Sequence, residues 1–190
     1  MNSYSYDNVH QYIDALFLST LRPGDKIIDA TVGNGNDTYK IAKIIGKEGH
    51  IFGFDIQEKA IDTTRKKLKL IENGPTFSLH LCGHENVEKY VTSKVSFIIF
   101  NLGYLPSADK TVTTKSETTI VALNKCLKLL KNGGIISVAI YPGHYEGEKE
   151  LNDILSWAID IEQKEFNISH IKFLNHKNNP PQLIIIQKKR

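Results

Sequence analysis

The chain has 190 residues, 41% of them hydrophobic and 24% charged, a balance that suits a folded globular chain and excludes global disorder. Its formal net charge of +3 permits a nucleic-acid partner without requiring one. The two cysteines, Cys82 and Cys126, lie far apart with no paired spacing, which argues against a disulfide framework and against a zinc site.

A first helix is predicted from Asn8 to Ser19, where apolar side chains recur at helical spacing. Asp7 or Asn8 can cap its start. His10 lies within this helix, and we interpret it as a polar surface residue in preference to one that faces a substrate. The sequence from Arg22 to Asp25 contains Pro-Gly, which ends the helix and leads into the first strand.

The first strand, Lys26–Asp29, runs into the glycine turn Asp29-Ala-Thr-Val-Gly33-Asn-Gly35-Asn-Asp37-Thr38 and then into a helix that begins near Asn36. Glycines can take positive φ and let a ligand approach the backbone, and a helix start offers free N–H groups. We therefore expect a nucleotide-like cofactor here, with a plain turn as the alternative. A dinucleotide is disfavoured, because Thr38 replaces the third glycine of its fingerprint and Asp29 would repel a pyrophosphate. A ligand with an ammonium group is favoured instead.

The second strand, His50–Asp55, also ends in an acid, in the position where a carboxylate accepts hydrogen bonds from a ribose diol. Gln57 could reach the adenine or ribose edge. An amphipathic helix is predicted from Glu58 to Asn73 and carries four cations within residues 65–69. We interpret these cations as a solvated helix face, with an RNA contact as the alternative.

A third strand, Phe77–Leu81, delivers Cys82-Gly-His84-Glu85 to its carboxyl end. Ligands of open α/β sheets bind outside the carboxyl ends of the strands, so His84 or Glu85 is expected to border a cofactor. The alternative, which the sequence favours about equally, is that these residues cap a helix over 85–90.

The most continuously apolar strand, Val95–Phe100, is predicted to be central in the sheet and to deliver Asn101-Leu-Gly-Tyr104 to the same crevice. Residues 105–115 are long enough to cover a substrate or to be a simple connection. Ser116 is expected to cap the next helix, which Lys131-Asn-Gly-Gly134 closes.

A fifth strand, Gly134–Ile140, leads into Tyr141-Pro-Gly-His144 on the ligand side. His144 is the best general-base candidate by residue type, with a structural loop histidine as an equal alternative. A helix through Leu151 and Ala158 follows. Two further strands, Phe166–Phe173 and Leu183–Gln187, flank the polar loop 174–181.

The alternation of strands and helices predicts an α/β fold, a doubly wound and mostly parallel sheet with helices on both faces. No repeat or linker divides the chain, so residues 1–190 are expected to form a single domain. No apolar run approaches the length of a membrane span, and the N-terminus lacks a charged-then-apolar leader, so we expect a cytoplasmic enzyme without a membrane partner.

Taken together, these motifs resemble those of the class I S-adenosylmethionine-dependent methyltransferases, and more closely the small bacterial rRNA methylase group. The resemblance spans nearly the whole chain and rests on the glycine turn 29–38, Gly53–Gln57, Gly83–Glu85, Asn101–Pro106 and Tyr141–His144. It implies a Rossmann-like sheet of seven strands whose last strand is antiparallel. It also implies S-adenosylmethionine as cofactor and, for some members, methylation of the aminomethyl group on the wobble 2-thiouridine of tRNA. A homodimer is a further expectation.

The expected site follows from the same resemblance. The residues expected to bind the cofactor are Asp29, Thr31, Gly33, Asn34, Gly35, Asn36, Asp37, Thr38, Asp55, Gln57, His84, Glu85, Asn101 and Gly103. The expected catalytic residues are Asn101, Tyr104 and His144, and no metal is expected. Many amino-methyltransferases carry Asn/Asp-Pro-Pro-Tyr where this chain has Asn101-Leu-Gly-Tyr104. The absence of both prolines argues against a planar exocyclic adenine nitrogen as the methyl acceptor. It is compatible with an aliphatic amine as the acceptor.

The tRNA substrate is expected to contact Lys172, His176 and Lys177, near the loop between the last two strands. Four alternatives stay open at this stage. They are a methyltransferase of rRNA, a methyltransferase of a small molecule, a noncatalytic RNA-binding module and a nicotinamide oxidoreductase. The oxidoreductase is disfavoured by the same features that disfavour a dinucleotide.

Overall fold

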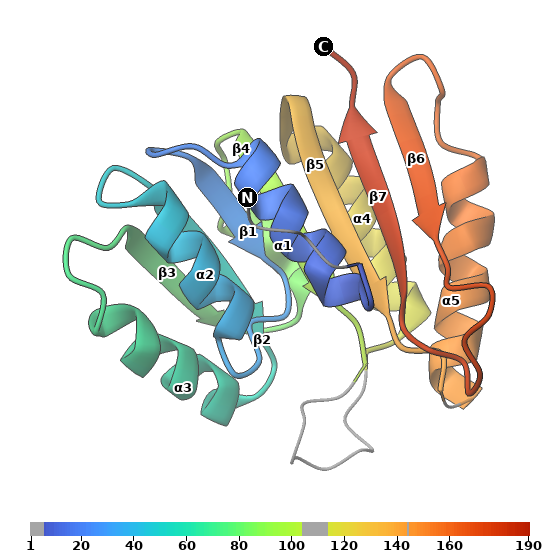
Figure 1. Cartoon of the computed structure of the whole chain (residues 1–190). Coiled ribbons are helices and arrows are strands. Elements are labelled where there is room, and N and C mark those ends of the chain that lie inside the picture. Colours follow the sequence, from blue (N-terminus) through green and yellow to red (C-terminus); the bar gives the residue numbers. More distant parts are fainter. Residues whose placement is uncertain (1–5, 104–113, 144) are drawn as a thin grey trace.

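A computed structural model describes residues 6–103, 114–143 and 145–190 of the chain (Figure 1). Seven strands form one sheet in the order β3-β2-β1-β4-β5-β7-β6. Their bounds are β1 Lys26–Asp29, β2 His50–Asp55, β3 Thr76–Leu81, β4 Val95–Asn101, β5 Leu130–Ile140, β6 Phe166–Ile171 and β7 Gln182–Lys188. Strands β1 to β5 pair in parallel, whereas β7 is antiparallel to both β5 and β6. The predicted α/β fold with an antiparallel last strand is confirmed.

Helices cover both faces of this sheet. Their bounds are α1 Val9–Thr20, α2 Asn36–Ile45, α3 Glu58–Lys69, the short 3₁₀ helix η1 His84–Lys89, α4 Ser116–Leu129 and α5 Tyr145–Ile159. Figure 1 shows α1, α2 and α3 in front of the sheet and α4 and α5 behind it. Among the residues that the structure describes, no helix is long and apolar enough to cross a membrane.

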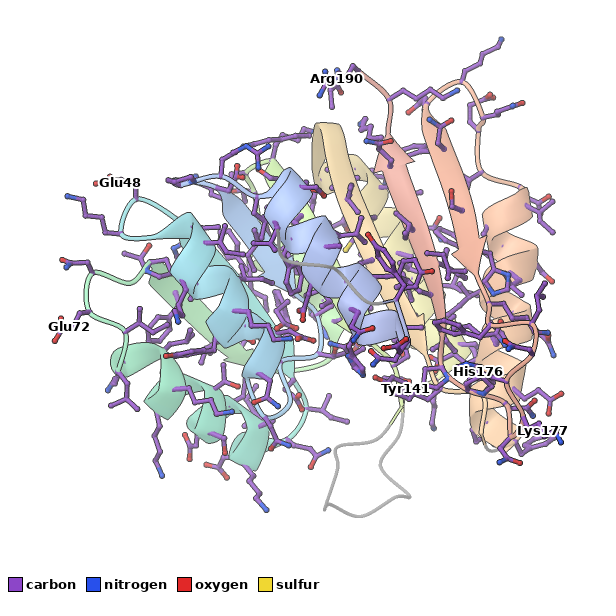
Figure 2. The ribbon with its side chains drawn as sticks, viewed as in Figure 1. Glu48, Glu72, Tyr141, His176, Lys177 and Arg190 are labelled. Carbon is purple, nitrogen blue, oxygen red and sulfur yellow. The ribbon has the colours of Figure 1, made fainter. Side chains whose placement is uncertain are left out.

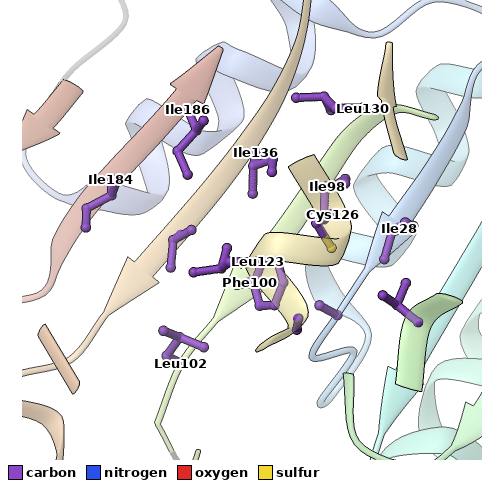
Figure 3. Packing of buried hydrophobic residues seen from close by; sticks show 14 of the residues in the cluster. Ile28, Ile98, Phe100, Leu102, Leu123, Cys126, Leu130, Ile136, Ile184 and Ile186 are labelled. Carbon is purple, nitrogen blue, oxygen red and sulfur yellow. The ribbon is translucent and has the colours of Figure 1, made fainter. Parts of the chain in front are cut away.

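The two faces follow from alternation along the strands, since successive side chains of a strand point to opposite sides. On the central strand β4, Phe97 and Ile99 pack with α1 and α2, while Ile98 and Phe100 pack with α4 and α5. All four side chains are fully buried. Figure 3 shows the second cluster, in which Leu123 of α4 meets β4, β5 and β7. A strand that is buried on both faces needs a continuous apolar run, which is why Val95–Phe100 was predictable as central.

The predicted start of the fifth strand is wrong. Lys131–Gly134 was expected to close the preceding helix, yet β5 begins at Leu130 and includes these residues. Leu130 pairs with Val95 and Ile135 pairs with Phe97, so the intervening residues bulge out of register. Gly133 has a φ of 77°, a conformation that glycine adopts without steric cost, and it lets the strand continue past the bulge.

Two helix boundaries also differ from the prediction. The cap of α4 is Lys115, which makes no side-chain capping bond, and Ser116 is instead the first helical residue, whose hydroxyl accepts a hydrogen bond from Lys149 Nζ (3.1 Å). Helix α3 ends at Lys69, four residues before the predicted Asn73. Leu70 is 80% exposed, so the last predicted turn has little apolar surface to bury against the sheet.

The carboxyl ends of β1, β2, β4 and β5 meet at one edge of the sheet because these strands are parallel. Figure 2 shows Tyr141, His176 and Lys177 toward this edge, with Arg190 at the opposite end of the sheet. The predicted ligand side is therefore a single edge of the molecule.

Candidate functional site

A cavity of about 1110 Å³ lies at the carboxyl edge of the sheet. Its lining comes from the ends of β1, β2, β3, β4 and β5, from α1, and from the loop that precedes β7. The expected cofactor residues on its wall are Asp29, Thr31, Gly33, Asn34, Asn36, Asp37, Asp55, Gln57, His84, Glu85, Asn101 and Gly103. Gly35 and Thr38 lie behind the wall and support it. The topology thus brings together residues that are up to 74 positions apart, since Asp29 and Gly103 share one cavity.

The glycine turn has a steric reason at each glycine. Gly33 and Gly35 have φ values of 50° and 72°. A Cβ added at Gly35 would lie 2.6 Å from Thr64 Oγ1 of α3, so any larger residue would collide with that helix. Thr64 Oγ1 also donates a hydrogen bond to the Gly33 carbonyl oxygen (3.2 Å). The turn therefore brings its backbone close to the cavity while α3 holds it from behind, and α2 begins at Asn36.

Asp29 is almost fully buried, with 1% of its surface exposed. Its carboxylate accepts hydrogen bonds from Thr38 Oγ1 (2.6 Å) and from the Thr31 amide (3.2 Å). Burial, together with the neighbouring carboxylates of Asp37 and Asp55, raises the pKa of Asp29 to about 7. A bound cation would reverse this effect, because it would stabilise the ionised form. The site is therefore electrostatically prepared for a positively charged ligand.

Asp55 lies on the same wall at the end of β2. One carboxylate oxygen accepts from the Gly33 amide (3.0 Å) and the other from the Gln57 amide (2.9 Å). Burial raises the pKa of Asp55, and these backbone hydrogen bonds oppose the rise. Each carboxylate oxygen can accept a second hydrogen bond, so Asp55 is suited to a ligand with hydroxyl groups.

His84 and Glu85 begin the short helix η1 and line the cavity. A helix therefore forms here, one residue earlier than the alternative expected, and the contact with a cofactor stays a prediction. The capping alternative is wrong in its detail, because the cap is Gly83 and it makes no side-chain bond. His84 is buried, and its Nδ1 lies 3.3 Å from the Ala30 carbonyl oxygen, while its Nε2 has no partner among the described residues. Burial lowers the pKa of His84 and so favours the neutral ring. A buried ring nitrogen on a cavity wall is a ready contact for a ligand.

Asn101 ends the central strand β4 and touches both the cavity and the glycine turn. Its Nδ2 donates to Asp37 Oδ2 (3.0 Å), and its backbone amide donates to Thr31 Oγ1 (2.7 Å). An ionised carboxylate only accepts hydrogen bonds, which fixes the amide orientation and turns Asn101 Oδ1 away from Asp37. That oxygen is buried and has no partner among the residues that the structure describes. It can therefore accept a hydrogen bond from a ligand.

Gly103 follows with a φ of 125°, outside the range of ordinary side chains. Its amide donates to Thr114 Oγ1 (2.9 Å), and the Thr114 amide donates to the Gly103 carbonyl oxygen (3.1 Å). Thr114 Oγ1 donates in turn to the buried carboxylate of Glu150 on α5 (2.7 Å). The two ends of the 104–113 segment are thus joined to one another and to α5. Tyr104 and His144, two of the three expected catalytic residues, lie outside the described residues.

The expected RNA contacts are exposed but do not line the cavity. Lys172, His176 and Lys177 lie on the protein surface beside it, and the His176 ring stacks on Phe173 at 4.6 Å. The part of the same loop that reaches the cavity is 178–181. Asn178 and Asn179 have φ values of 64° and 46°, which turn the chain sharply at the rim.

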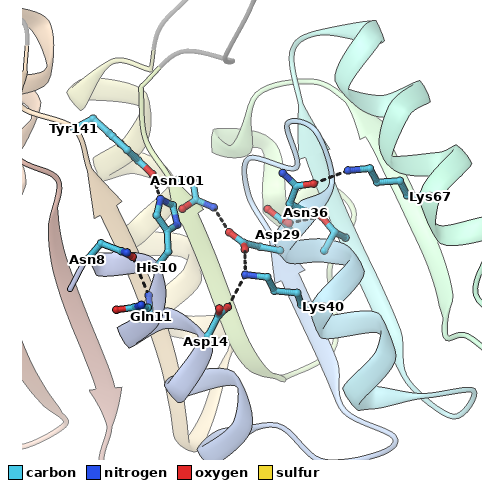
Figure 4. A network of polar contacts seen from close by, with 12 residues as sticks. Asn8, His10, Gln11, Asp14, Asp29, Asn36, Lys40, Lys67, Asn101 and Tyr141 are labelled. Carbon is cyan, nitrogen blue, oxygen red and sulfur yellow. Dashed lines mark hydrogen bonds and ion pairs between the residues drawn. The ribbon is translucent and has the colours of Figure 1, made fainter. Parts of the chain in front are cut away.

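His10 was expected to be a polar surface residue in preference to one that faces a substrate. It is exposed, as expected, and it also lines the cavity, where its Nε2 lies 3.1 Å from the Tyr141 hydroxyl (Figure 4). Tyr141 also lines the cavity but was not among the expected site residues. The only signal for His10 was its place beside the apolar stripe of its helix. No local pattern shows that this helix crosses the sheet next to the end of the fifth strand.

Known proteins are similar to this chain along most of its length. A family model described as "Putative rRNA methylase" matches residues 51–187. A curated relative is the chloroplastic tRNA (mnm(5)s(2)U34)-methyltransferase of Arabidopsis thaliana, 32% identical over 179 residues that cover 88% of this chain and 65% of the relative. Another is the ubiquinone/menaquinone biosynthesis C-methyltransferase UbiE of Teredinibacter turnerae, 26% identical over 76% of this chain and 51% of the relative. The chain thus spans about half to two thirds of the length of these two curated relatives.

Two solved structures are similar over 97% of this chain and 99% of their own. The first, from Clostridium thermocellum, is described as a "putative rRNA-methylase" and has 42% identity and a TM-score of 0.90. The second, from Streptococcus mutans, is described as "a putative methyltransferase" in complex with SAH and has 35% identity and a TM-score of 0.86.

Proposed function

The chain belongs to the rRNA methylase family, and from that premise we propose that it transfers a methyl group from S-adenosylmethionine to the aminomethyl nitrogen of 5-aminomethyl-2-thiouridine at the wobble position of tRNA. The observation that carries this proposal is the position of Asn101. Its Oδ1 is buried and has no partner within residues 6–103, 114–143 and 145–190. It lies at the end of the central strand, on the cavity that the glycine turn and the carboxylates of Asp29, Asp37 and Asp55 also line.

The cavity residues fit the cofactor on structural grounds. S-adenosylmethionine supplies an electrophilic methyl group on a sulfonium and carries a cationic ammonium group and an adenosine. Asp29 and Asp37 would offset the positive charges, Asp55 would accept the ribose hydroxyls, and His84 Nε2 would meet the adenine. The SAH-bound relative from Streptococcus mutans supports this assignment.

The groups around Asn101 support an amine nitrogen as the methyl acceptor. Its Oδ1 can accept an N–H of an amine and so orient the nitrogen, which is the main contribution that methyl transfer needs from the protein. Leu102 is buried and Gly103 has a left-handed φ, so the backbone here differs from a Pro-Pro pair. The name of the Arabidopsis relative supports a wobble-uridine amine as the substrate.

The proposal is tested by incubating the protein with labelled S-adenosylmethionine and tRNA that carries 5-aminomethyl-2-thiouridine, followed by nucleoside mass analysis. We expect one added methyl group on the aminomethyl nitrogen. A tRNA with 2-thiouridine but no aminomethyl group is the matched control and should accept no methyl. Methylation of rRNA or of a free small molecule in parallel reactions, with none on this tRNA, would overturn the substrate assignment. Binding of tRNA without consumption of the cofactor would overturn the enzymatic assignment.

A further inference from the structure

Helix α1 contributes one polar side chain, His10, to the cavity, and the proposed function does not use it. His10 and Asp14 lie one helical turn apart on the same face of α1. His10 Nε2 lies 3.1 Å from the Tyr141 hydroxyl, and Asp14 forms an ion pair with Lys40 of α2 (2.7 Å) (Figure 4). Both His10 and Tyr141 line the cavity. Helix α1 lies near the start of the chain, yet it reaches the cavity beside the end of β5.

Tyr141 is placed by the same strand ends that place Asn101. It directly follows β5, in which Ala139 is the register partner of Asn101. The Leu102 amide donates to the Ala139 carbonyl oxygen (2.8 Å), which extends this pairing past the strand. A Cβ at Gly103 would lie 3.8 Å from Tyr141 Cδ2, so the phenol ring rests against the glycine. An amine held by Asn101 would be bound beside this ring.

An aliphatic amine that is protonated must lose a proton before it can be methylated. A primary ammonium resembles that of lysine, with a pKa of about 10, so at neutral pH nearly all of it lacks the lone pair that attacks the methyl group. A phenol alone is a poor proton acceptor. Burial and then the Asp37 carboxylate raise the pKa of Tyr141 to about 12, which keeps its proton in place. A phenol can accept a proton only if it passes its own to a neighbour.

We propose that Tyr141 and His10 form a proton relay that deprotonates the acceptor amine. This inference rests on the proposed function, because it requires an ammonium substrate. One ammonium proton moves to the Tyr141 oxygen as the phenol proton moves to His10 Nε2. The freed lone pair then forms the N–C bond, and the electron pair of the C–S bond stays on sulfur. His10 is exposed and returns the proton to water.

The contact between the two side chains is short enough for this transfer, because the Tyr141 hydroxyl lies 3.1 Å from His10 Nε2. In the relay the phenol donates to Nε2, and the ring hydrogen of His10 is on Nδ1. Asp37 is a poorer acceptor, because Asn101 Nδ2 donates to it at 3.0 Å and Lys40 lies 3.5 Å away. The other titratable or charged groups on the described cavity wall are Asp29, Asp55, Cys82, His84, Glu85 and Lys115. Tyr141 is the catalytic residue of the pair, and His10 acts through it.

The test compares single-turnover methylation of the aminomethylated tRNA by wild type, Tyr141→Phe and His10→Gln from pH 6.5 to 9.5. The phenylalanine keeps the ring without the hydroxyl, and the glutamine keeps a hydrogen-bonding group that does not titrate. General acid–base catalysis contributes about 10²- to 10⁴-fold, so we expect both variants to be about 100-fold slower near pH 7. The deficit should shrink toward pH 9.5, where solvent supplies more free amine. Tyr39→Phe, on the outer surface of α2, is the control and should follow wild type.

Three other outcomes contradict the relay. If Tyr141→Phe matches wild type at every pH, the amine loses its proton elsewhere, and the proposed function stands. If both variants are slower by one constant factor across the range, the pair only positions the substrate. If wild type methylates an uncharged RNA nitrogen and leaves the aminomethyl group alone, the relay and the substrate assignment both fail. Calorimetric binding of S-adenosylmethionine should be unchanged in both variants, which excludes a disturbed cofactor site.

Discussion

Asp29 shows how one buried side chain prepares the site for its ligand. Its pKa is raised from 3.8 to about 7, chiefly by burial, although two hydrogen bonds stabilise its ionised form. The unfolded chain ionises this carboxyl group near pH 4, whereas the folded chain retains the proton until about pH 7. Folding stability from this group is therefore intact below pH 4, falls as the pH rises from 4 to 7, and is constant above.

Asp29→Asn tests this effect. The amide has the same shape, can donate to Thr38 Oγ1 and can accept from the Thr31 amide, but it carries no charge. A shift of about three pKa units corresponds to ~4 kcal/mol, so without cofactor the variant should be more stable than wild type at pH 8 by up to that amount. Urea unfolding should show this gain at pH 8 and none at pH 4. Equal stabilities at pH 8 would show that the carboxylate is not strained by burial.

At the scale of elements, the glycine turn between β1 and α2 depends on two separate effects. Gly35 combines a left-handed φ of 72° with close contact to Thr64 of α3. Gly46, which follows α2, has a similar φ of 60°, but a Cβ there would meet nothing within 4 Å. The two glycines therefore separate backbone strain from collision.

Gly46→Ala should cost about 1–3 kcal/mol of unfolding free energy, because φ 60° with ψ −168° is a region that glycine alone adopts readily. Gly35→Ala should cost about 1–2 kcal/mol for a left-handed alanine and a further ~1–3 kcal/mol, because the methyl group would collide with α3. Urea unfolding of both variants measures these losses. A loss at Gly35 of no more than about 2 kcal/mol, the strain alone, would mean that α3 moves aside freely and does not hold the turn.

Helices and strands could be predicted where a local sequence pattern determines them. Contacts between residues far apart in the sequence could not. The continuous apolar run Val95–Phe100 requires burial on both faces, so the central strand and the exit of Asn101 at its end could be read from the sequence. The bulge after Leu130 could not, because it depends on pairing with β4. The contact of His10 with Tyr141 was missed for the same reason. Its partner, Tyr141, lies 131 positions away, and helical periodicity carries no information on such a pair.

At the scale of the whole molecule, the cavity and the proposed RNA surface share one edge of the sheet. The glycine turn, with Asp29 and Asp37, lines the cavity together with Asp55 and Asn101. Lys172 and Lys177 lie on the exposed surface beside its rim. This arrangement would let tRNA dock on the rim and insert one modified base. The homodimer that the family resemblance implies stays a prediction, which analytical ultracentrifugation would test.

The double variant Lys172→Ala with Lys177→Ala should weaken tRNA binding and reduce the slope of log affinity against log salt by about one per lost phosphate contact. Binding measured across a salt series checks both effects. Lys47→Ala is the control, since it is an exposed cation next to Glu48 at the other end of the sheet. An unaltered slope in the double variant would exclude this rim and make the cations at 65–69 on α3 the next candidate.

Asn101 is proposed to hold the target amine through its Oδ1, which has no partner in the described part of the chain. Single-turnover methylation by Asn101→Ala, at saturating tRNA and S-adenosylmethionine, measures this role, with the exposed Asn152→Ala of α5 as the control. Loss of a group that orients the nucleophile should slow the reaction about 100-fold, or ~3 kcal/mol, while calorimetry shows cofactor affinity within about threefold of wild type. A variant that methylates the aminomethyl nitrogen at the wild-type rate would contradict the assignment of this site.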